Sequence, residues 1–426
     1  MLTQNKKIIK RRWPQLLAEI LKSDLLQLQF EMSDTIDPTL IINGIHLSSG
    51  YNQSSEAELQ TERIPEFSTE VWVYGLATGA LPYALLQRVN IKKIHVVILN
   101  PAVALLSLTH FDHSDWLNDS RVELRVGREE NGKLHSPLTV CPAELQLADD
   151  DSARLRDKIF LELVSPYMNK RHSEDNSDIV EQIARNTQYV AKDGDVKALF
   201  NTKVGGSIII AAAGPSLDKS LPKMVVEREK YFIIAVNSAL KPLLAASIIP
   251  DLVIVIDDDP KIVSSFQALN TEQLKSLPLV YFPRVPSEIL SLWSGPRFTA
   301  YSQYRSYDSI RKQYPKTNLF ASGSVLHTAT DLAVKMGAKQ IIFVGADLAF
   351  SNGQIYAKGT GWGDDEIGAT QHWVLDGYGN RIPTRASFRG YLRDLEDYIE
   401  QAPAEVEFIN SSKEGANIAG TMLWKH

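Results

Sequence analysis

The sequence predicts an α/β protein made of two parallel β-sheets in series, each with helices between its strands. Short apolar runs typical of buried strands alternate with helical stretches, once before residue 128 and again after residue 206. The chain has 426 residues, more than the roughly 250 to 300 at which a single core stops growing. We therefore expect two doubly wound, Rossmann-like sheets in tandem.

Three segments are expected along the chain. Residues 1–65 form an N-terminal α+β cap, residues 66–195 a Rossmann-like domain, and residues 196–426 a second α/β domain with the stronger alternation. The cap contains these elements: a helical stretch from Lys6 to Leu21 that Pro14 kinks or breaks, and strands at Leu25–Phe30 and Thr39–Leu47. The boundary before residue 196 is placed in a polar stretch with weak periodicity.

Apolar runs of strand length predict the two sheets. Those of the first sheet are Val71–Tyr74, Ile94–Leu99 and Arg121–Val126. Those of the second are Ser207–Ala212, Tyr231–Val236, Leu252–Ile256, Leu279–Phe282 and Gln340–Val344. Ligands of open parallel sheets bind outside the carboxyl ends of the strands, so the turns after these runs are the places to look for function.

Composition narrows the class of protein. Hydrophobic residues make up 44% and charged residues 23%, which is ordinary for a soluble globular protein. The net charge of -6 gives no attraction to nucleic acid or to an anionic membrane, so neither is an expected partner. Cys141 is the only cysteine, which excludes an intramolecular disulfide and a zinc site built from thiolates. With no signal-peptide pattern and no apolar run of about 20 residues, a cytoplasmic protein is expected.

The turn after the first strand of the first sheet superficially suggests a nucleotide site. Gly75 and Gly79 flank it, but the central glycine that lets a ligand approach the backbone is missing. Asn100 stands where a ribose-binding acid would follow the next strand. A structural turn is therefore favoured, and the first sheet is expected to be a scaffold or an acceptor-docking domain.

The corresponding turn of the second sheet is better equipped. Its strand runs into Gly214-Pro215-Ser216, and a helix is expected to begin near Pro222 after a further turn. Exposed backbone N–H groups and the Ser216 hydroxyl would then cradle a phosphate. A capped strand-to-helix connection explains the same residues equally well.

Polar side chains end the next two strands. Asn237 and Ser238 follow one strand, and Asp257-Asp258-Asp259 follow the other. Three adjacent carboxylates repel one another, so two functional interpretations stand: one functional acid with two solvated neighbours, or a divalent cation such as Mg²⁺ held together with substrate phosphates. A solvated turn without a function is a third interpretation. No obligatory cofactor and no metal site built by protein ligands alone is expected.

Further candidates lie later in the chain. Ser322-Gly323-Ser324 begins an apolar helix and suits contact with an anion or a ribose, although ordinary capping explains it almost as well. Asp347 closes a strand and accepts hydrogen bonds from backbone amides or from a hydroxylated ligand. His372 is a candidate general base. No Ser–His–Asp order and no helical His-x-x-x-His spacing indicates a hydrolase or a metal site.

Several of these motifs together resemble the motility-associated-factor (Maf) glycosyltransferases, whose central domain is the DUF115 or MptE-like domain. The motifs are Gly205-Gly-Ser-Ile-Ile-Ile-Ala-Ala-Ala-Gly-Pro-Ser-Leu-Asp218, Ala235-Val-Asn-Ser238, Ser322-Gly-Ser324, Phe343-Val-Gly-Ala-Asp347, Phe408-Ile-Asn-Ser411 and Gly415-Ala-Asn-Ile-Ala-Gly420. The family is associated with transfer of nonulosonic, sialic-acid-like sugars from CMP-activated donors to serine or threonine of flagellin. Its central domain is similar to bacterial sialyltransferases.

The resemblance implies a role for each matching residue. Gly214, Pro215 and Ser216 would line the nucleotide phosphate, Asn237 and Asp257 would face the nucleotide, Ser322 and Gly323 would contact cytidine or ribose, Tyr356 would stabilise the departing phosphate, and the base would fall near His372. A second tyrosine of the sialyltransferases has no match, because Ala349 and Phe350 occupy that region. The implied enzyme is an inverting glycosyltransferase that works by single displacement.

Two other functions remain open. The same central domain is similar to archaeal-type hydroxymethylpterin diphosphokinases, which predicts magnesium-dependent ATP binding and AMP release. A non-catalytic sugar-nucleotide-binding or assembly protein would keep the fold, bind the ligand and leave the donor unconsumed. The chain ends soon after Gly420, whereas larger Maf proteins carry a further helical domain, so flagellin is the expected acceptor only by resemblance.

Overall fold

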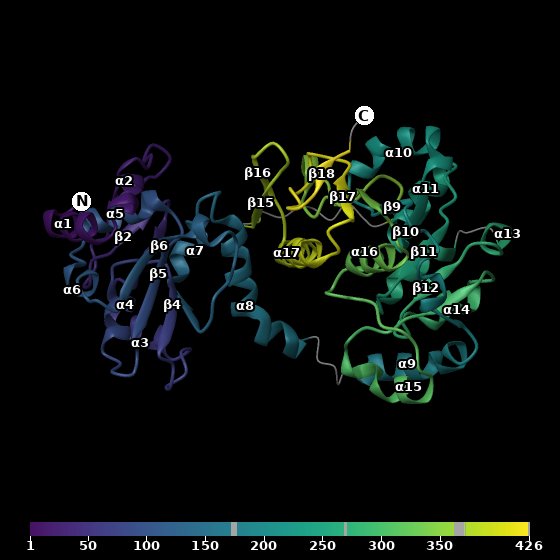
Figure 1. The fold of residues 1–426 in the computed structure, drawn as a ribbon, viewed down its shortest axis with the longest axis horizontal. Helices are drawn as coiled ribbons and strands as arrows, with labels where there is room; N and C mark the ends of the chain where they lie inside the picture. The colour runs from purple at the N-terminus through teal and green to yellow at the C-terminus, as the bar shows by residue number, and fades with distance from the viewer. Residues whose placement is uncertain (172–176, 268–270, 362–369, 371, 425–426) are drawn as a thin grey trace. The chain divides into compact units, whose positions relative to one another are not determined.

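The computed structural model describes residues 1–426 except 172–176, 268–270, 362–369, 371 and 425–426. The chain divides into two compact units, Met1–Ser165 and Pro166–His426. Each unit contains a parallel β-sheet with helices packed on it (Figure 1). The predicted α/β class with parallel sheets is confirmed.

The first unit is built on a four-stranded sheet. Its strands, in spatial order, are β6 (Val122–Val126), β5 (Lys93–Ile98), β4 (Glu70–Tyr74) and β7 (Leu138–Val140). All three strand pairs are parallel. Because side chains alternate along a strand, Val71 and Val73 join one apolar cluster while Trp72 and Tyr74 join another. Both faces of this sheet are therefore covered.

Eight helices of the described residues belong to or begin in this unit. They are α1 (Thr3–Arg12), α2 (Pro14–Leu21), α3 (Gln53–Thr61), α4 (Ala80–Leu86), α5 (Pro101–His110), α6 (Ser114–Leu117), α7 (Pro142–Gln146) and α8 (Ala153–Arg171). The predicted break at Pro14 is confirmed, since Trp13 separates α1 from α2. Ile9 and Ile20 of these two helices are buried in the same cluster as Val71.

The N-terminal strands differ from the prediction. The run Leu25–Phe30 is not a strand, because Leu28 closes a turn onto the Leu25 carbonyl and the spacing of three buries both side chains in part. Strand β1 is Phe30–Met32 instead. The run Thr39–Leu47 is a hairpin, β2 (Leu40–Ile42) and β3 (Ile45–His46), since Asn43 and Gly44 between them adopt φ of 49° and 79° as a tight hairpin turn requires.

The second unit holds a nine-stranded sheet within the described residues. Its order is β18 (Met422–Leu423), β17 (Glu407–Asn410), β14 (Gln340–Val344), β9 (Ser207–Ala211), β10 (Phe232–Val236), β11 (Leu252–Val255), β12 (Leu279–Tyr281), β13 (Arg297–Thr299) and β8 (Gly194–Asp195). Every pair is parallel. The five strands predicted here are present, each to within one residue. The other four strands, β8, β13, β17 and β18, are too short or too polar to predict.

The order of the strands reverses at one point of this sheet. From β9 the chain steps outward through β10, β11, β12 and β13, and then helix α16 (Val325–Lys335) leads back to β14 on the other side of β9. Helix α16 packs on β9, β10, β11 and β14, and α17 (Ala386–Gln401) packs on α16 (Figure 1). The switch point of the sheet therefore lies between β9 and β14.

The remaining helices and one hairpin complete this unit. The helices are α9 (Ser177–Val190), α10 (Ser216–Val226), α11 (Leu240–Ala245), α12 (Ser264–Gln267), α13 (Thr271–Leu274), α14 (Ser287–Leu292) and α15 (Asp308–Gln313). Strands β15 (Trp373–Leu375) and β16 (Arg381–Pro383) pair antiparallel.

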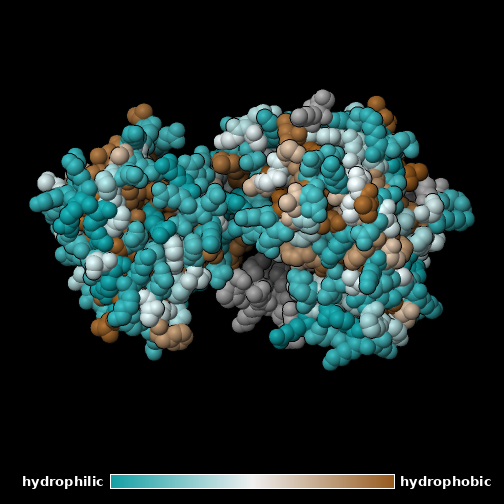
Figure 2. Space-filling model, viewed as in Figure 1, coloured by the Kyte–Doolittle hydropathy of each residue, from teal (hydrophilic) through white to brown (hydrophobic). Residues whose placement is uncertain are grey.

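The surface shown in Figure 2 is covered mainly by hydrophilic residues, with apolar side chains scattered among them. Among the helices of the described residues, none combines the length and the apolar character that crossing a bilayer requires.

Candidate functional site

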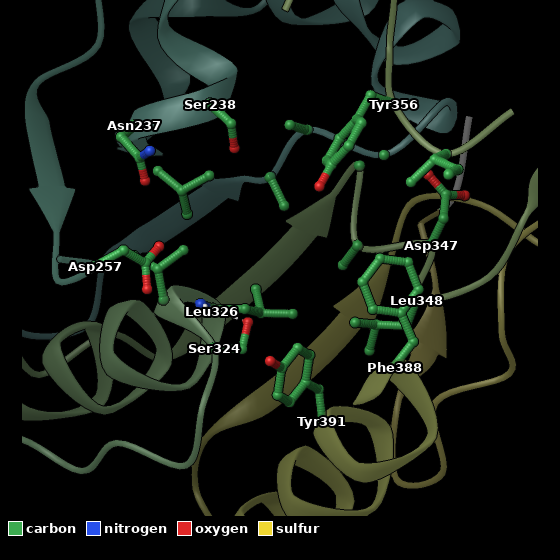
Figure 3. A pocket seen from close by; sticks show the side chains of 18 of the residues that line it. Asn237, Ser238, Asp257, Ser324, Leu326, Asp347, Leu348, Tyr356, Phe388 and Tyr391 are labelled. Carbon is green, nitrogen blue, oxygen red and sulfur yellow. Dashed lines mark hydrogen bonds between the residues drawn. The ribbon is translucent and has the colours of Figure 1, made fainter. Parts of the chain in front are cut away.

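A cavity of about 350 Å³ opens at the switch point of the second sheet. Its walls come from the turns that follow β9, β10, β11 and β14, from the first turn of α16 and from α17 (Figure 3). In an open parallel sheet the loops diverge at the switch point, and this leaves a crevice in which ligands bind. The cavity is therefore the candidate functional site of this unit.

Several polar side chains in the cavity have no hydrogen-bond partner in the described part of the chain. The three that matter most here are Asn237 after β10, Asp257 after β11 and Tyr391 on α17. All three line the cavity, and Figure 3 shows them around it. Asn237 is only 3% exposed, and its amide group faces the cavity without a protein partner. The hydrogen-bonding capacity of these groups is available to a ligand.

The charge state of Asp257 is shifted by its surroundings. Burial raises the pKa of its carboxyl to about 6, Arg284 opposes the rise, and the charges of Asp258 and Asp259 add to it. The carboxylate is thus held ready to exchange a proton near neutral pH. Burial also raises the pKa of the nearby Tyr391 hydroxyl, with the Asp257 charge acting in the same direction, so Tyr391 stays protonated.

The three adjacent aspartates separate into different roles. Asp258 forms an ion pair with Arg284, with 2.9 Å between Oδ2 and Nη2. Asp259 accepts a hydrogen bond of 2.9 Å from the Lys261 amide and caps the turn after β11. Within the described residues no three acidic, histidine or cysteine side chains gather as a metal site would require. Of the three carboxylates, Asp257 is the one that neither an ion pair nor a hydrogen bond engages in the described residues.

Asp347 proves to be part of the framework. It lines the cavity, but its Oδ2 accepts a hydrogen bond of 2.9 Å from the Ser216 amide, and its Oδ1 accepts one of 3.3 Å from the Ser351 hydroxyl. Burial raises the pKa of Asp347, and its hydrogen bonds from Ser216 and Ser351 oppose that rise. The carboxylate caps the N-terminus of α10, so the helix begins at Ser216 rather than near Pro222.

The turn Gly214-Pro215-Ser216 is not the open phosphate cradle that the sequence suggested. The Gly214 amide donates to the Gly345 carbonyl at 2.8 Å, the Ser216 amide is taken by Asp347, and proline has no N–H. The anion at the N-terminus of α10 is therefore the Asp347 carboxylate, not a bound phosphate. Of the three residues only Gly214 lines the cavity, so a bound phosphate would need donors elsewhere.

Only part of the segment Ser322-Gly323-Ser324 reaches the cavity. The Ser322 hydroxyl donates to Asp394 at 2.6 Å and does not line the cavity. Gly323 and Ser324 do line it, and the Ser324 hydroxyl oxygen caps α16 by accepting from the Leu326 amide at 3.3 Å. The N-terminus of this eleven-residue helix therefore opens on the cavity.

Aromatic side chains complete the walls. Tyr356 lies on the side of the cavity opposite Asp257 in Figure 3, and Phe388 and Tyr391 enter from α17. No role was predicted for Phe388 or Tyr391, although their spacing of three places both on one helix face. Tyr391 is a second tyrosine in the cavity. It lies on α17, whereas the resemblance implied a second tyrosine near Ala349 and Phe350.

His372 is not among the described residues that line the cavity. Its Nδ1 lies 3.0 Å from Nη1 of Arg389. An arginine N–H only donates, so Nδ1 accepts and the proton of the neutral ring lies on Nε2. Neither nitrogen is then placed to take a proton from a substrate, and the predicted role as a base gains no support from this geometry.

The equivalent switch point of the first unit is filled by a side chain. Glu144, from α7 after β7, is buried and accepts hydrogen bonds from the amides of Leu76 and Ala77 at 2.8 and 2.5 Å. The neighbouring cavity, bordered by Ala77 and Cys141, measures only about 10 Å³. That space suits about one water, not a nucleotide, as expected for a structural turn.

Glu144 makes the stability of the first unit depend on pH. Burial raises its pKa from 4.5 to about 7, against the two amide hydrogen bonds. A raised carboxyl pKa means that the folded state binds the proton more tightly, so stability is lost as pH rises from 4.5 to about 7. In urea unfolding, the free energy of unfolding of the wild-type first unit should fall by about 2 kcal/mol between pH 5.5 and 8, and Glu144→Gln should remove this fall. An unchanged pH dependence in this variant would contradict the assignment.

Comparison with known proteins adds a partial family match. Residues 181–353 match the family model described as 6-hydroxymethylpterin diphosphokinase MptE-like. This confirms the predicted resemblance to the MptE-like central domain over most of the motif-bearing segment; Tyr356 and His372 lie outside the match. No curated protein sequence matches the chain.

Among solved structures, the Maf glycosyltransferase from Magnetospirillum magneticum AMB-1 matches with 15% sequence identity and a TM-score of 0.48. The alignment covers 99% of this chain and 74% of that chain. A likeness at this level supports no functional argument by itself.

Proposed function

From the MptE-like match and the chemistry of the cavity, we propose that the chain is a glycosyltransferase. Its donor would be a CMP-activated nonulosonic acid, and its acceptor a protein hydroxyl, with flagellin as the first candidate. The second unit would bind the donor at the switch point of its sheet, in the manner of a sialyltransferase. The predicted ranges 1–65, 66–195 and 196–426 and a cytoplasmic location belong to the same proposal.

One observation carries this proposal. Asn237, Asp257 and Tyr391 bring an amide, a carboxyl and a phenol without partners among the described residues into one cavity, beside motifs of an MptE-like domain. Unpaired polar groups in a partly buried site are costly unless a ligand satisfies them. A nucleotide sugar has the hydroxyl, amine and phosphate groups to do so.

The charges of the cavity suggest how the donor lies. The aspartates after β11 would repel a phosphate, whereas the N-terminus of α16, at Gly323 and Ser324, attracts one. Tyr356, across the cavity from Asp257, would then donate to the departing phosphate. Gly214 and Asp347 would shape the wall beside it, and Pro215, Ser216 and Ser322 would support that wall from behind.

The name of the matching family favours a second candidate, a 6-hydroxymethylpterin diphosphokinase. That reaction transfers diphosphate from ATP and would need magnesium. The pairing of Asp258 with Arg284 and of Asp259 with the Lys261 amide leaves few carboxylates for a cation. We therefore rank it second, ahead of a binding or assembly protein without turnover.

The discriminating measurement is the thermal stability of the protein with CMP, CDP, UMP, GDP and ATP, each with and without magnesium. A ligand that binds only the folded state at 100 times its Kd adds about 2.7 kcal/mol. We expect CMP to stabilise the second unit without magnesium. Stabilisation by ATP only with magnesium would instead favour the diphosphokinase, and no response to any nucleotide would contradict both enzymatic candidates.

A further inference from the structure

Resting on the proposed function, we propose that Asp257 is the general base of the transfer, the group that takes the proton from the acceptor hydroxyl. The acceptor oxygen would attack the anomeric carbon and form the new glycosidic bond. The bond from that carbon to the phosphate oxygen would break, and its electron pair would leave with CMP. The proton held by Asp257 would then pass to solvent.

The position of Asp257 in the cavity is the first argument. Inversion by single displacement requires the attacking oxygen and the leaving phosphate on opposite sides of the anomeric carbon. Asp257 and Tyr356 both line the cavity and lie on opposite sides of it (Figure 3). If the phosphate leaves beside Tyr356, Asp257 lies on the side from which the acceptor enters.

The second argument is that Asp257 is the carboxylate left free for this task. Its two neighbours are held by Arg284 and by the Lys261 amide, and Asp347 is held by Ser216. Donors that hold a carboxylate lower its basicity, so the carboxylate without such donors is the better base. In the described residues, no group donates a hydrogen bond to Asp257.

The third argument concerns the groups that face Asp257 from each neighbouring element. Arg284, after β12, stabilises its charge, while Asp258 and Asp259 on its own turn oppose it. Tyr391, on α17, stays protonated and does not compete for the proton. The balance leaves the pKa of Asp257 near 6, so the base is mostly ionised at neutral pH yet basic enough to accept a proton.

The experiment compares Asp257→Asn with Asp259→Asn, a matched loss of one charge at an exposed turn cap. CMP release from CMP-activated N-acetylneuraminic, pseudaminic and legionaminic acids is followed with and without an acceptor protein, and CMP binding is measured by calorimetry. We expect Asp257→Asn to lower kcat a hundredfold or more and to leave the Kd for CMP within about threefold. The wild-type rate should fall as pH drops through about 6. Asp259→Asn should keep the rate at neutral pH and move this fall to a lower pH, because the charge of Asp259 helps to raise the pKa of Asp257.

Each other outcome overturns the assignment in a recognisable way. If Asp257→Asn keeps the wild-type rate and its acid limb, the base lies elsewhere while the transferase function stands. If the variant loses CMP binding in step with its rate, Asp257 holds the nucleotide and does not take the proton. If the wild-type protein binds CMP but releases none from any of the three donors, the proposed function fails, and the role of Asp257 fails with it.

Discussion

Gly214→Ala is expected to unfold the candidate site and to lower the free energy of unfolding of the second unit by about 3 kcal/mol or more. A Cβ at this position would lie 2.3 Å from Oδ2 of Asp347 and 2.6 Å from the carbonyl oxygen of Gly345. Both contacts are far inside van der Waals distance, and the carbonyl belongs to the backbone after β14, so it cannot give way as the end of a flexible side chain would. The turn must shift, and the hydrogen bond from Ser216 to Asp347 is lost with it.

A matched control is available at the other end of the same strand. Gly206 precedes β9, and the nearest atom to its added Cβ is the Lys203 carbonyl oxygen at 3.2 Å. Gly206→Ala should therefore cost less than about 1 kcal/mol in urea unfolding. CMP binding should disappear in Gly214→Ala and persist in Gly206→Ala. Equal stability of the two variants would show that the close approach between the β9 and β14 turns is not needed.

Tyr356→Phe is expected to slow transfer about a hundredfold, which corresponds to about 3 kcal/mol of transition-state stabilisation. In the proposed mechanism the phenol donates a hydrogen bond to the phosphate as negative charge develops on it, and phenylalanine keeps the ring without the donor. Because the charge grows only in the transition state, kcat should fall while CMP binding changes little. Single-turnover CMP release and calorimetry measure the two quantities separately.

Two further variants test whether the effect belongs to Tyr356. Tyr378 is 65% exposed and does not line the cavity, so Tyr378→Phe should leave both quantities unchanged. Tyr391→Phe, alone and together with Tyr356→Phe, shows whether the second tyrosine of the cavity shares the phosphate. A wild-type rate in Tyr356→Phe would remove this residue from the mechanism even if the chain is a glycosyltransferase.

The strands could be predicted from the sequence wherever burial on both faces left a continuous apolar run. Runs such as Ile208–Ala211 and Leu252–Val255 have no solvent-exposed face, so their composition alone indicates buried parallel strands. Strand β13 could not be found this way. Its three residues, Arg297–Thr299, include a charged one whose guanidinium pairs with Asp193, a partner 104 positions away.

The candidate site was predictable only in part, for a related reason. The sequence placed Asn237 and Asp257 at strand ends, and strand ends of a parallel sheet share one edge, so their meeting in the cavity follows from the pattern. It did not indicate that Asp347 would occupy the amide of Ser216, or that Glu144 would occupy those of Leu76 and Ala77. Asp347 lies in the turn after β14 and Glu144 in α7, each across the switch point from the amides that it accepts from. Strand order brings these groups together, and local periodicity does not reveal strand order.

By itself, the sequence determined the α/β class, most strands of both sheets and the motifs that match an MptE-like domain, because these depend on local patterns of apolar and polar residues. Only the tertiary structure decided which of the polar residues are free. Hydrogen bonds between distant segments engage Ser216, Ser322 and Asp347 and leave Asn237, Asp257 and Tyr391 facing an open cavity. A side chain's availability for chemistry depends on partners far away in the sequence, and folding alone brings those partners together.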